Sequence, residues 1–193
     1  MKYEGNPALL LRQLADKSRE VSEQRATKQD LTNAWSGVGF SLCGETVVAP
    51  MGEVVEIITV PRYTLVPAVK PWMLGIANVR GRLLPIVDTE AFFGNKLAGH
   101  KSNYRVLIVE TSHIYVGLVV SKVYGLQHLD EASLKTLGKS ADLPFAGFAD
   151  AYSEQEDGTW YRVSPSRLVT DSDFSDAAIV SHHIATSHKG EVA

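Results

Sequence analysis

The order of apolar and polar residues divides the chain into a helical N-terminal segment and a long region of short β-strands. Over residues 7–21 the apolar positions recur at helical spacing and predict an amphipathic helix, which Asn6 can cap and Pro7 can open. A second, short helix is predicted at residues 31–35. We therefore expect residues 1–35 to form a helical extension. The apolar stripe of its first helix consists of Leu10, Leu14 and Val21.

From residue 38 onward the apolar residues alternate with polar ones or gather in short runs between turn residues, as they do in β-strands. Strands and hairpins are predicted at residues 38–42, 46–49, 53–58, 74–87, 105–120 and 145–163. Short helices are predicted at residues 89–94 and 130–137, and the proline-rich stretch of residues 61–71 is not expected to be regular. A succession of short strands with irregular joins is typical of small β-barrels, because closing a sheet removes its exposed edges.

The hairpin at residues 74–87 has two arginines at its bend. Its strands are rich in Ile, Leu and Val, and Arg80 and Arg82 flank Gly81 between them. A hairpin bend needs only turn residues, which the glycine supplies. Two guanidinium groups beside strands that look buried suggest an arginine that recognises a partner or locks a rigid scaffold.

Composition narrows the possible functions. The chain has 193 residues, of which 45% are hydrophobic, enough for a sizeable core. Its formal net charge of −3 argues against nucleic acid as a partner, because nucleic-acid binders usually carry a basic excess. The apolar runs are too short to span a bilayer and residues 1–5 lack the apolar core of a signal peptide, so we expect a cytoplasmic protein without membrane insertion. Cys43 is the single cysteine, which excludes an internal disulfide and a cysteine-rich metal site.

The sequence contains no recognisable catalytic motif. It has no Walker-type phosphate loop, Gly37 and Gly39 lack the third glycine of a dinucleotide fingerprint, and Ser41 misses the Gly-x-Ser-x-Gly arrangement by one residue. The carboxylate pair Asp130-Glu131 lies in a polar segment, which favours a solvated surface over acid/base chemistry. We therefore expect no catalytic residue and no cofactor.

Three histidines near the C-terminus could hold a transition metal if their segment were ordered, namely His182, His183 and His188. The segment has little apolar patterning, so we favour a flexible tail over residues 173–193 and expect no metal site. The remaining histidines are predicted in loops, at His100, His113 and His128.

The arginine hairpin is part of a longer, ordered set of motifs. It reads Gly75-Ile76-Ala77-Asn78-Val79-Arg80-Gly81-Arg82-Leu83-Leu84-Pro85-Ile86-Val87-Asp88 and is followed by Phe92-Phe93-Gly94. This run resembles the signature of CheW-like domains, and the strands at residues 38–42 and 53–57 and the hairpin at 105–120 fall in that family's order. The resemblance places a CheW-like domain at residues 36–172. Residues 35–40, with the helical N-terminal segment, resemble the type IV pilus-associated branch of the family, the PilI-type adaptors.

The resemblance implies a fold and a function. The fold is all-β, with two intertwined five-stranded SH3-like β-barrels, an N-terminal helical extension and short connecting helices. The function is that of a non-enzymatic signalling adaptor, which couples the cytoplasmic tip of a chemoreceptor to the regulatory domain of a CheA-type histidine kinase. The pilus branch implies control of twitching motility and a place at membrane-associated receptor arrays, in which several copies can assemble.

The same resemblance assigns residues to these contacts. Arg80 matches the arginine that the family pairs with a glutamate, and Glu56 occupies that glutamate's place, so the two could meet bidentately. Val54 and Ile57 match apolar positions that line the receptor groove. Gly81 of the bend is assigned to the same groove. The strand that meets the kinase is implied to be the one that contains Val116, Leu118 and Val120, with its binding face undecided.

Two alternatives remain open at this point. A small β-barrel enzyme or ligand-binding protein could bind an anionic molecule in a pocket built from Arg80, Arg82, Tyr104 and Arg105. The leucine stripe of the N-terminal extension must also be covered, either by its own barrel or by a partner or second copy.

Overall fold

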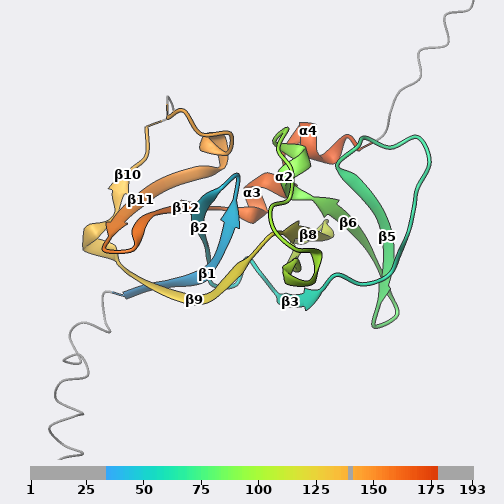
Figure 1. Ribbon diagram of the computed structural model, residues 1–193, viewed down its shortest axis with the longest axis horizontal. Helices are drawn as coiled ribbons and strands as arrows, with labels where there is room; N and C mark the ends of the chain where they lie inside the picture. The colour runs from blue at the N-terminus through green and yellow to red at the C-terminus, as the bar shows by residue number, and fades with distance from the viewer. Residues whose placement is uncertain (1–33, 139–140, 178–193) are drawn as a thin grey trace, which may run out of the picture.

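The computed structural model describes residues 34–138 and 141–177, and its strands form two sheets, each of which curls into a small barrel. The predicted helix at residues 7–21 and the C-terminal histidines His182, His183 and His188 lie outside these ranges. Figure 1 shows the two barrels side by side, with strands β1, β2 and β9 to β12 on the left and β3 to β6 on the right.

The first barrel is a sheet in the order β10-β11-β12-β2-β1-β9. Its strands are β1 (Ala34–Leu42), β2 (Glu45–Pro50), β9 (Val123–Asp130), β10 (Lys135–Thr136), β11 (Ala149–Gln155) and β12 (Gly158–Val163). The second barrel has the order β3-β7-β8-β6-β5-β4. Its strands are β3 (Glu56–Thr59), β4 (Tyr63–Thr64), β5 (Met73–Val79), β6 (Arg82–Asp88), β7 (Arg105–Glu110) and β8 (Tyr115–Val120).

The two barrels are intertwined because the chain builds the first one from both of its ends. After β1 and β2 it forms the whole second barrel, and β12 then returns to pair with β2 in parallel. The second barrel has a matching parallel pair, β6 with β8. Each barrel therefore has five main strands and one strand of two residues, and the predicted all-β fold with two intertwined five-stranded SH3-like barrels is confirmed.

Short helices and 3-10 turns connect the strands. They are α2 (Thr89–Phe92), α3 (Pro165–Val169), α4 (Ser172–Ser175) and the 3-10 turns η1 (Lys101–Asn103), η2 (Glu131–Ser133) and η3 (Ala146–Phe148). Asp88 caps α2 by accepting a hydrogen bond from the N–H of Ala91. Phe174 of α4 is buried and stacks on Trp72, with 5.4 Å between ring centroids. The C-terminal helices thus belong to the folded unit.

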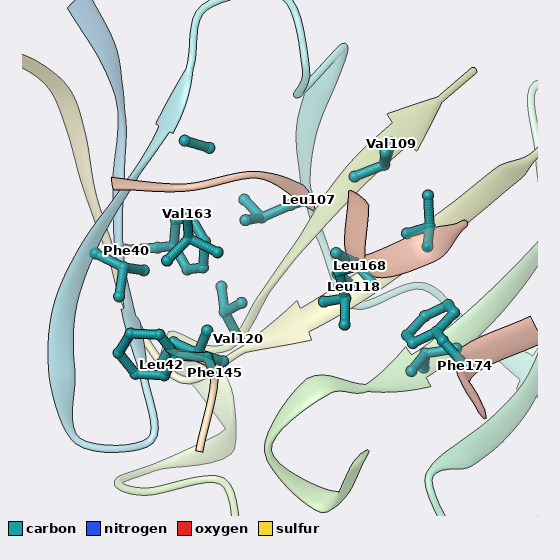
Figure 2. Close-up of a cluster of buried hydrophobic side chains, with 14 of the residues drawn as sticks. Phe40, Leu42, Leu107, Val109, Leu118, Val120, Phe145, Val163, Leu168 and Phe174 are labelled. Carbon is teal, nitrogen blue, oxygen red and sulfur yellow. The ribbon is translucent and has the colours of Figure 1, made fainter. Parts of the chain in front are cut away.

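The largest apolar cluster lies between the barrels, and Figure 2 shows its side chains converging from both sheets. On β7 and β8, alternate residues point to opposite sides. Leu107 and Leu118 belong to the cluster between the barrels, whereas Ile108 and Val119 fill the interior of the second barrel. Because both faces of this hairpin are covered, its strands read as nearly continuous apolar runs.

Two carboxylates fasten the joints between the barrels. Glu90 on α2, only 4% exposed, accepts the backbone N–H of Cys43 with both oxygens, at 2.9 and 3.0 Å. Cys43 is in the β1–β2 turn, so this bond joins the second barrel to the first. In the link from β2 to β3, Glu53 accepts bonds of 2.8 Å from the Ser164 hydroxyl and the Ser166 N–H at the start of α3.

The structure contradicts two secondary-structure predictions in the first barrel. Residues 34 and 35 belong to strand β1 rather than to a short helix, because Trp35 pairs with Leu129 of β9 and packs in the apolar cluster of that barrel. The helix predicted at residues 130–137 is only the turn η2, capped by Asp130, followed by the short strand β10. Strand β9 was not predicted, and His128 lies in it rather than in a loop.

We predict that Gly117→Ala destabilises the protein by about 1–3 kcal/mol, because it overfills the second barrel. A Cβ at Gly117 would lie 2.5 Å from a methyl carbon of Val106 and 3.2 Å from side-chain carbons of Ile86 and Leu84. Urea unfolding measures the change. The matched control is Gly147→Ala, whose Cβ would meet nothing within 4 Å. Equal unfolding free energies for the two variants would contradict the packing described here.

We also predict a pH-dependent effect of Glu90→Gln. Burial raises the pKa of the Glu90 carboxyl, and the neighbouring Asp88 adds to the effect, although the Cys43 N–H opposes it. A carboxyl whose pKa is higher in the folded state stabilises most below its unfolded pKa, and this contribution is lost as pH rises through the folded pKa. As pH rises above the ordinary glutamate pKa of 4.5, the stability difference should therefore shift in favour of Glu90→Gln. Parallel stability curves in urea unfolding would rule this out.

Candidate protein-binding site

The bend of the β5–β6 hairpin holds Arg80 in a left-handed conformation. Arg80 and Gly81 have φ angles of 52° and 82°, which makes the bend a type I′ turn, and the Gly81 N–H donates to the Asn78 side chain at 2.8 Å. A left-handed backbone costs a residue other than glycine about 1–2 kcal/mol, and Asn or Gly is the usual choice. An arginine at this position is therefore not the residue that best stabilises the turn.

The salt bridge that the sequence suggested between Arg80 and Glu56 is present. Nη2 of Arg80 donates to Oε1 of Glu56 at 2.6 Å, which connects the hairpin bend to the start of β3. The contact uses one oxygen and is not bidentate. The Arg80 side chain is 77% exposed, and exposed ion pairs stabilise proteins by at most about 1 kcal/mol. The pair can orient the guanidinium, but it contributes little to the stability of the barrel.

The bidentate pair at this end of the barrel is formed by Arg82 and Glu110. The guanidinium donates to both carboxylate oxygens, at 2.8 and 3.2 Å, and its carbon lies 3.7 Å from the centroid of the Tyr115 ring. Hydrogen bonding between the two side chains raises the pKa of Arg82 and lowers the pKa of Glu110. Sequence reasoning missed Glu110 and Tyr115, although their positions at the end of β7 and the start of β8 could have indicated a contact with the bend.

Two apolar side chains that flank Glu56 in the chain, one just before β3 and one on it, are exposed. Val55 is 57% exposed and Ile57 is 37% exposed. Ile57 is opposite Leu107 of β7, and side chains opposite each other in a ladder share a face. Leu107 is buried in the cluster between the barrels, so Val55 and Ile57 continue that apolar face into solvent. Val54, which the sequence assigned to the same surface, is instead half-buried against the cluster.

Further large apolar side chains are exposed on the first barrel. Met51 is exposed at the end of β2 and bridges to Val54 at the start of the link into β3. Leu126 of β9, also exposed, pairs with Val38 on the face that contains Phe40. We call Met51, Val55, Ile57 and the Glu56–Arg80 pair the β3 patch.

The three residues assigned to a kinase contact are not on the surface. Val116, Leu118 and Val120 are buried in the cluster between the barrels, where they pack against the first barrel and helix α3. This assignment was wrong because β8 is covered on both faces, so a partner can reach neither side of the strand. The exposed apolar residue nearest the bend is Leu83, which is 70% exposed at the start of β6.

The structure also contradicts the anion pocket proposed from the arginines. Arg80 and Arg82 lie near the end of β7 that is marked by Glu110, whereas Arg105 begins that strand and lies at its other end. Nη1 of Arg105 donates to the carbonyl oxygens of Ser102 and Tyr104, at 2.9 and 2.8 Å. The four side chains therefore do not line one pocket.

Cys43 is a free cysteine, and its environment does not activate it. Burial raises the pKa of the Cys43 thiol to about 11, so the thiol is protonated at neutral pH and is a poor nucleophile. Within residues 34–138 and 141–177, no three side chains are grouped as a metal site would require. In the same ranges no helix has the length and apolar character needed to cross a bilayer.

The chain resembles known proteins in sequence and in structure. Its residues 36–173 match the family model of the CheW-like domain. It is 36% identical over 173 residues to Protein PilI of Pseudomonas aeruginosa, covering 90% of this chain and 97% of that protein. It is 25% identical over 113 residues to the chemotaxis protein CheW of Helicobacter pylori, covering 58% of this chain and 68% of that protein.

A solved structure shares the fold. The scaffolding protein TtCheW from Thermoanaerobacter tengcongensis superposes with a TM-score of 0.63 at 24% sequence identity, over 72% of this chain and 95% of that one. The shared fold agrees with the family match and with the similarity to Protein PilI, which extends over 97% of that protein. The chain is therefore a member of the CheW-like domain family of scaffold adaptors, in the PilI-type branch.

Proposed function

We propose that this protein is a non-enzymatic adaptor that couples the cytoplasmic tip of a chemoreceptor to a CheA-type histidine kinase. The observation that carries the proposal is the β3 patch, an exposed apolar strip that continues the core between the barrels and is bordered by an oriented arginine. Similarity to Protein PilI supports an output in type IV pilus twitching motility. Coupling of this kind takes place in the cytoplasm, at membrane-associated receptor arrays.

The β3 patch fits a helical partner. A receptor tip made of amphipathic helices can lay an apolar stripe on Val55 and Ile57 while its polar flank meets Arg80. Large exposed apolar residues next to a rigid core offer contact area without a cost of reordering the backbone. The exposed ion pair of Arg80 leaves guanidinium N–H groups free for a second acceptor on the receptor.

The kinase contact needs a different surface, because β8 is buried. We assign it to the outer face of the β5–β6 hairpin, where Leu83 is exposed on the strand face opposite to that of Arg82. The regulatory domain of the kinase would meet this end of the second barrel. Ile57 of β3 and Leu83 of β6 are separated in the sheet by β7 and β8, which would let one adaptor bind both partners at once, and repetition of such contacts would build an array.

We predict that Ile57→Ser and Leu83→Ser have opposite binding defects. Ile57→Ser should weaken receptor binding at least about tenfold and leave kinase binding intact, and Leu83→Ser should do the reverse. Isothermal titration of the purified protein against a receptor cytoplasmic fragment and against the kinase regulatory domain measures both. Leu65→Ser, at an exposed leucine in the link between β4 and β5, is the matched control. Absence of binding to either partner at tens of micromolar would refute the adaptor function, whereas equal losses in both variants would refute only the assignment of separate surfaces.

We predict that Arg80→Asn separates function from folding. Asparagine tolerates the left-handed conformation, and the lost ion pair is exposed, so the unfolding free energy should stay within about 1 kcal/mol of the parent. Receptor affinity should fall about tenfold, because the side chain that orients toward the partner is lost. Arg62→Gln removes an exposed arginine outside the β3 patch and is the control for net charge. A large loss of stability in Arg80→Asn would show that the arginine is a structural lock.

A further inference from the structure

A cavity of about 580 Å³ lies at the junction of the two barrels, at the end of β7 opposite the Arg80 bend. The residues around it come from both barrels and from the loop between α2 and β7. Its polar lining consists of Ser41, Asn103, Arg105, Ser121 and Lys122. The volume is in the range of small-molecule sites, and the lining is rich in hydrogen-bond donors.

The charge of this cavity is not balanced. Arg105 and Lys122 line it, and none of its lining residues is acidic. In the part of the chain that the structure describes, neither side chain forms an ion pair, whereas Arg80, Arg82 and Arg162 each contact a carboxylate. Residues 91–109 contain no Asp or Glu. Two unpaired cations in a concave site focus a positive potential there, although the whole protein has a net charge of −3.

Hydrogen bonds hold the walls of the cavity in place. The two carbonyl contacts of Arg105 use only Nη1, so they fix the guanidinium plane and leave its other N–H groups out of these bonds. The hydroxyl of Tyr104 donates to the carbonyl oxygens of Leu97 and Gly99, at 3.2 and 3.3 Å, which ties down the loop.

The second cation is held at the other side of the cavity. The backbone N–H of Ser41 donates to the Lys122 carbonyl oxygen at 3.0 Å, which anchors this residue against β1. The Lys122 ammonium lies 4.6 Å from the centroid of the Tyr124 ring. Arg105 begins β7 of the second barrel, whereas Lys122 lies in the link from β8 to β9 of the first barrel. The Arg105 guanidinium and the Lys122 backbone are fixed by these bonds, which lowers the entropic cost of binding.

We propose that this cavity binds the phosphoryl groups of a small organic phosphate or oligophosphate. The Arg105 fork matches two oxygens of one phosphoryl group, and Lys122 supplies a point charge for another. Hydroxyl groups of Ser41 and Ser121 and the amide of Asn103 are available for the remaining oxygens. A ligand held by both cations joins the barrels at a further junction, besides those fastened by Glu53 and Glu90.

The test is a titration of the full-length protein with inorganic pyrophosphate at low ionic strength. Saturable binding is expected by calorimetry, with amide shifts in a nitrogen-15 spectrum at Gly99, Asn103 and Lys122. Arg105→Gln and Lys122→Gln should each weaken binding about tenfold or more, because each removes a charge-assisted contact. Added salt should weaken binding as well.

Arg62→Gln is the matched control, because it removes one positive charge from an exposed position outside the cavity. It should leave the affinity within about twofold of the parent. Absence of saturable binding up to millimolar pyrophosphate would overturn the proposal, and so would an equal loss in Arg62→Gln and Arg105→Gln. Equal affinity for citrate would overturn the assignment to phosphoryl groups. These outcomes do not depend on the adaptor function, since no receptor or kinase is present.

Discussion

The hairpin of β7 and β8 is the element on which the rest of the structure depends, because it is buried on both faces. Its inner side chains fill the second barrel, and its outer ones, such as Leu107 and Leu118, form the core between the barrels. Protein interiors are close-packed, so a shift of this hairpin would disturb both cores at once. The position of one barrel relative to the other is therefore set by the same side chains that stabilise the second barrel. Glu53 and Glu90 fasten that arrangement at its margins.

This packing explains why the candidate binding residues lie on β3. On the outer face of the second barrel, Leu107 of β7 and Leu118 of β8 are buried in the core between the barrels, whereas Ile57 of β3 and Leu83 of β6 are exposed. Val55, just before β3, and Ile57 on β3 stay exposed, and the strand cannot bend away because its partner β7 is locked in the core. A rigid apolar margin of this kind is suited to a partner helix. The exposed Arg80–Glu56 pair orients the Arg80 guanidinium at this surface but contributes little to the stability of the fold.

The sequence could predict the elements whose signal is local. The arginine hairpin and the hairpins at residues 105–120 and 145–163 were predicted because turn residues separate clear apolar runs. Strand β9 was missed because it is half-exposed and interrupted by Gly125 at a φ of 84°. The role of Val116 could not be read from its strand, because an unbroken apolar run does not reveal whether a second barrel or a partner covers its outer face. Glu110 was missed because its contact with Arg82 is 28 residues distant in sequence.

The two proposed sites lie toward opposite ends of the same central strand, which limits how they can influence each other. The β3 patch is joined to β7 through the pairing of Glu56 with Ile108, and Arg105 begins β7 at the cavity. A ligand in the cavity can change partner binding only if it favours one position of the barrels over another. Any such coupling is reciprocal, so a receptor on the β3 patch would change the affinity of the cavity by the same factor. Because β7 is packed on both sides, such coupling would have to act through a small movement of one barrel relative to the other. If the two sites bind independently, the core between the barrels holds the barrels in one fixed arrangement.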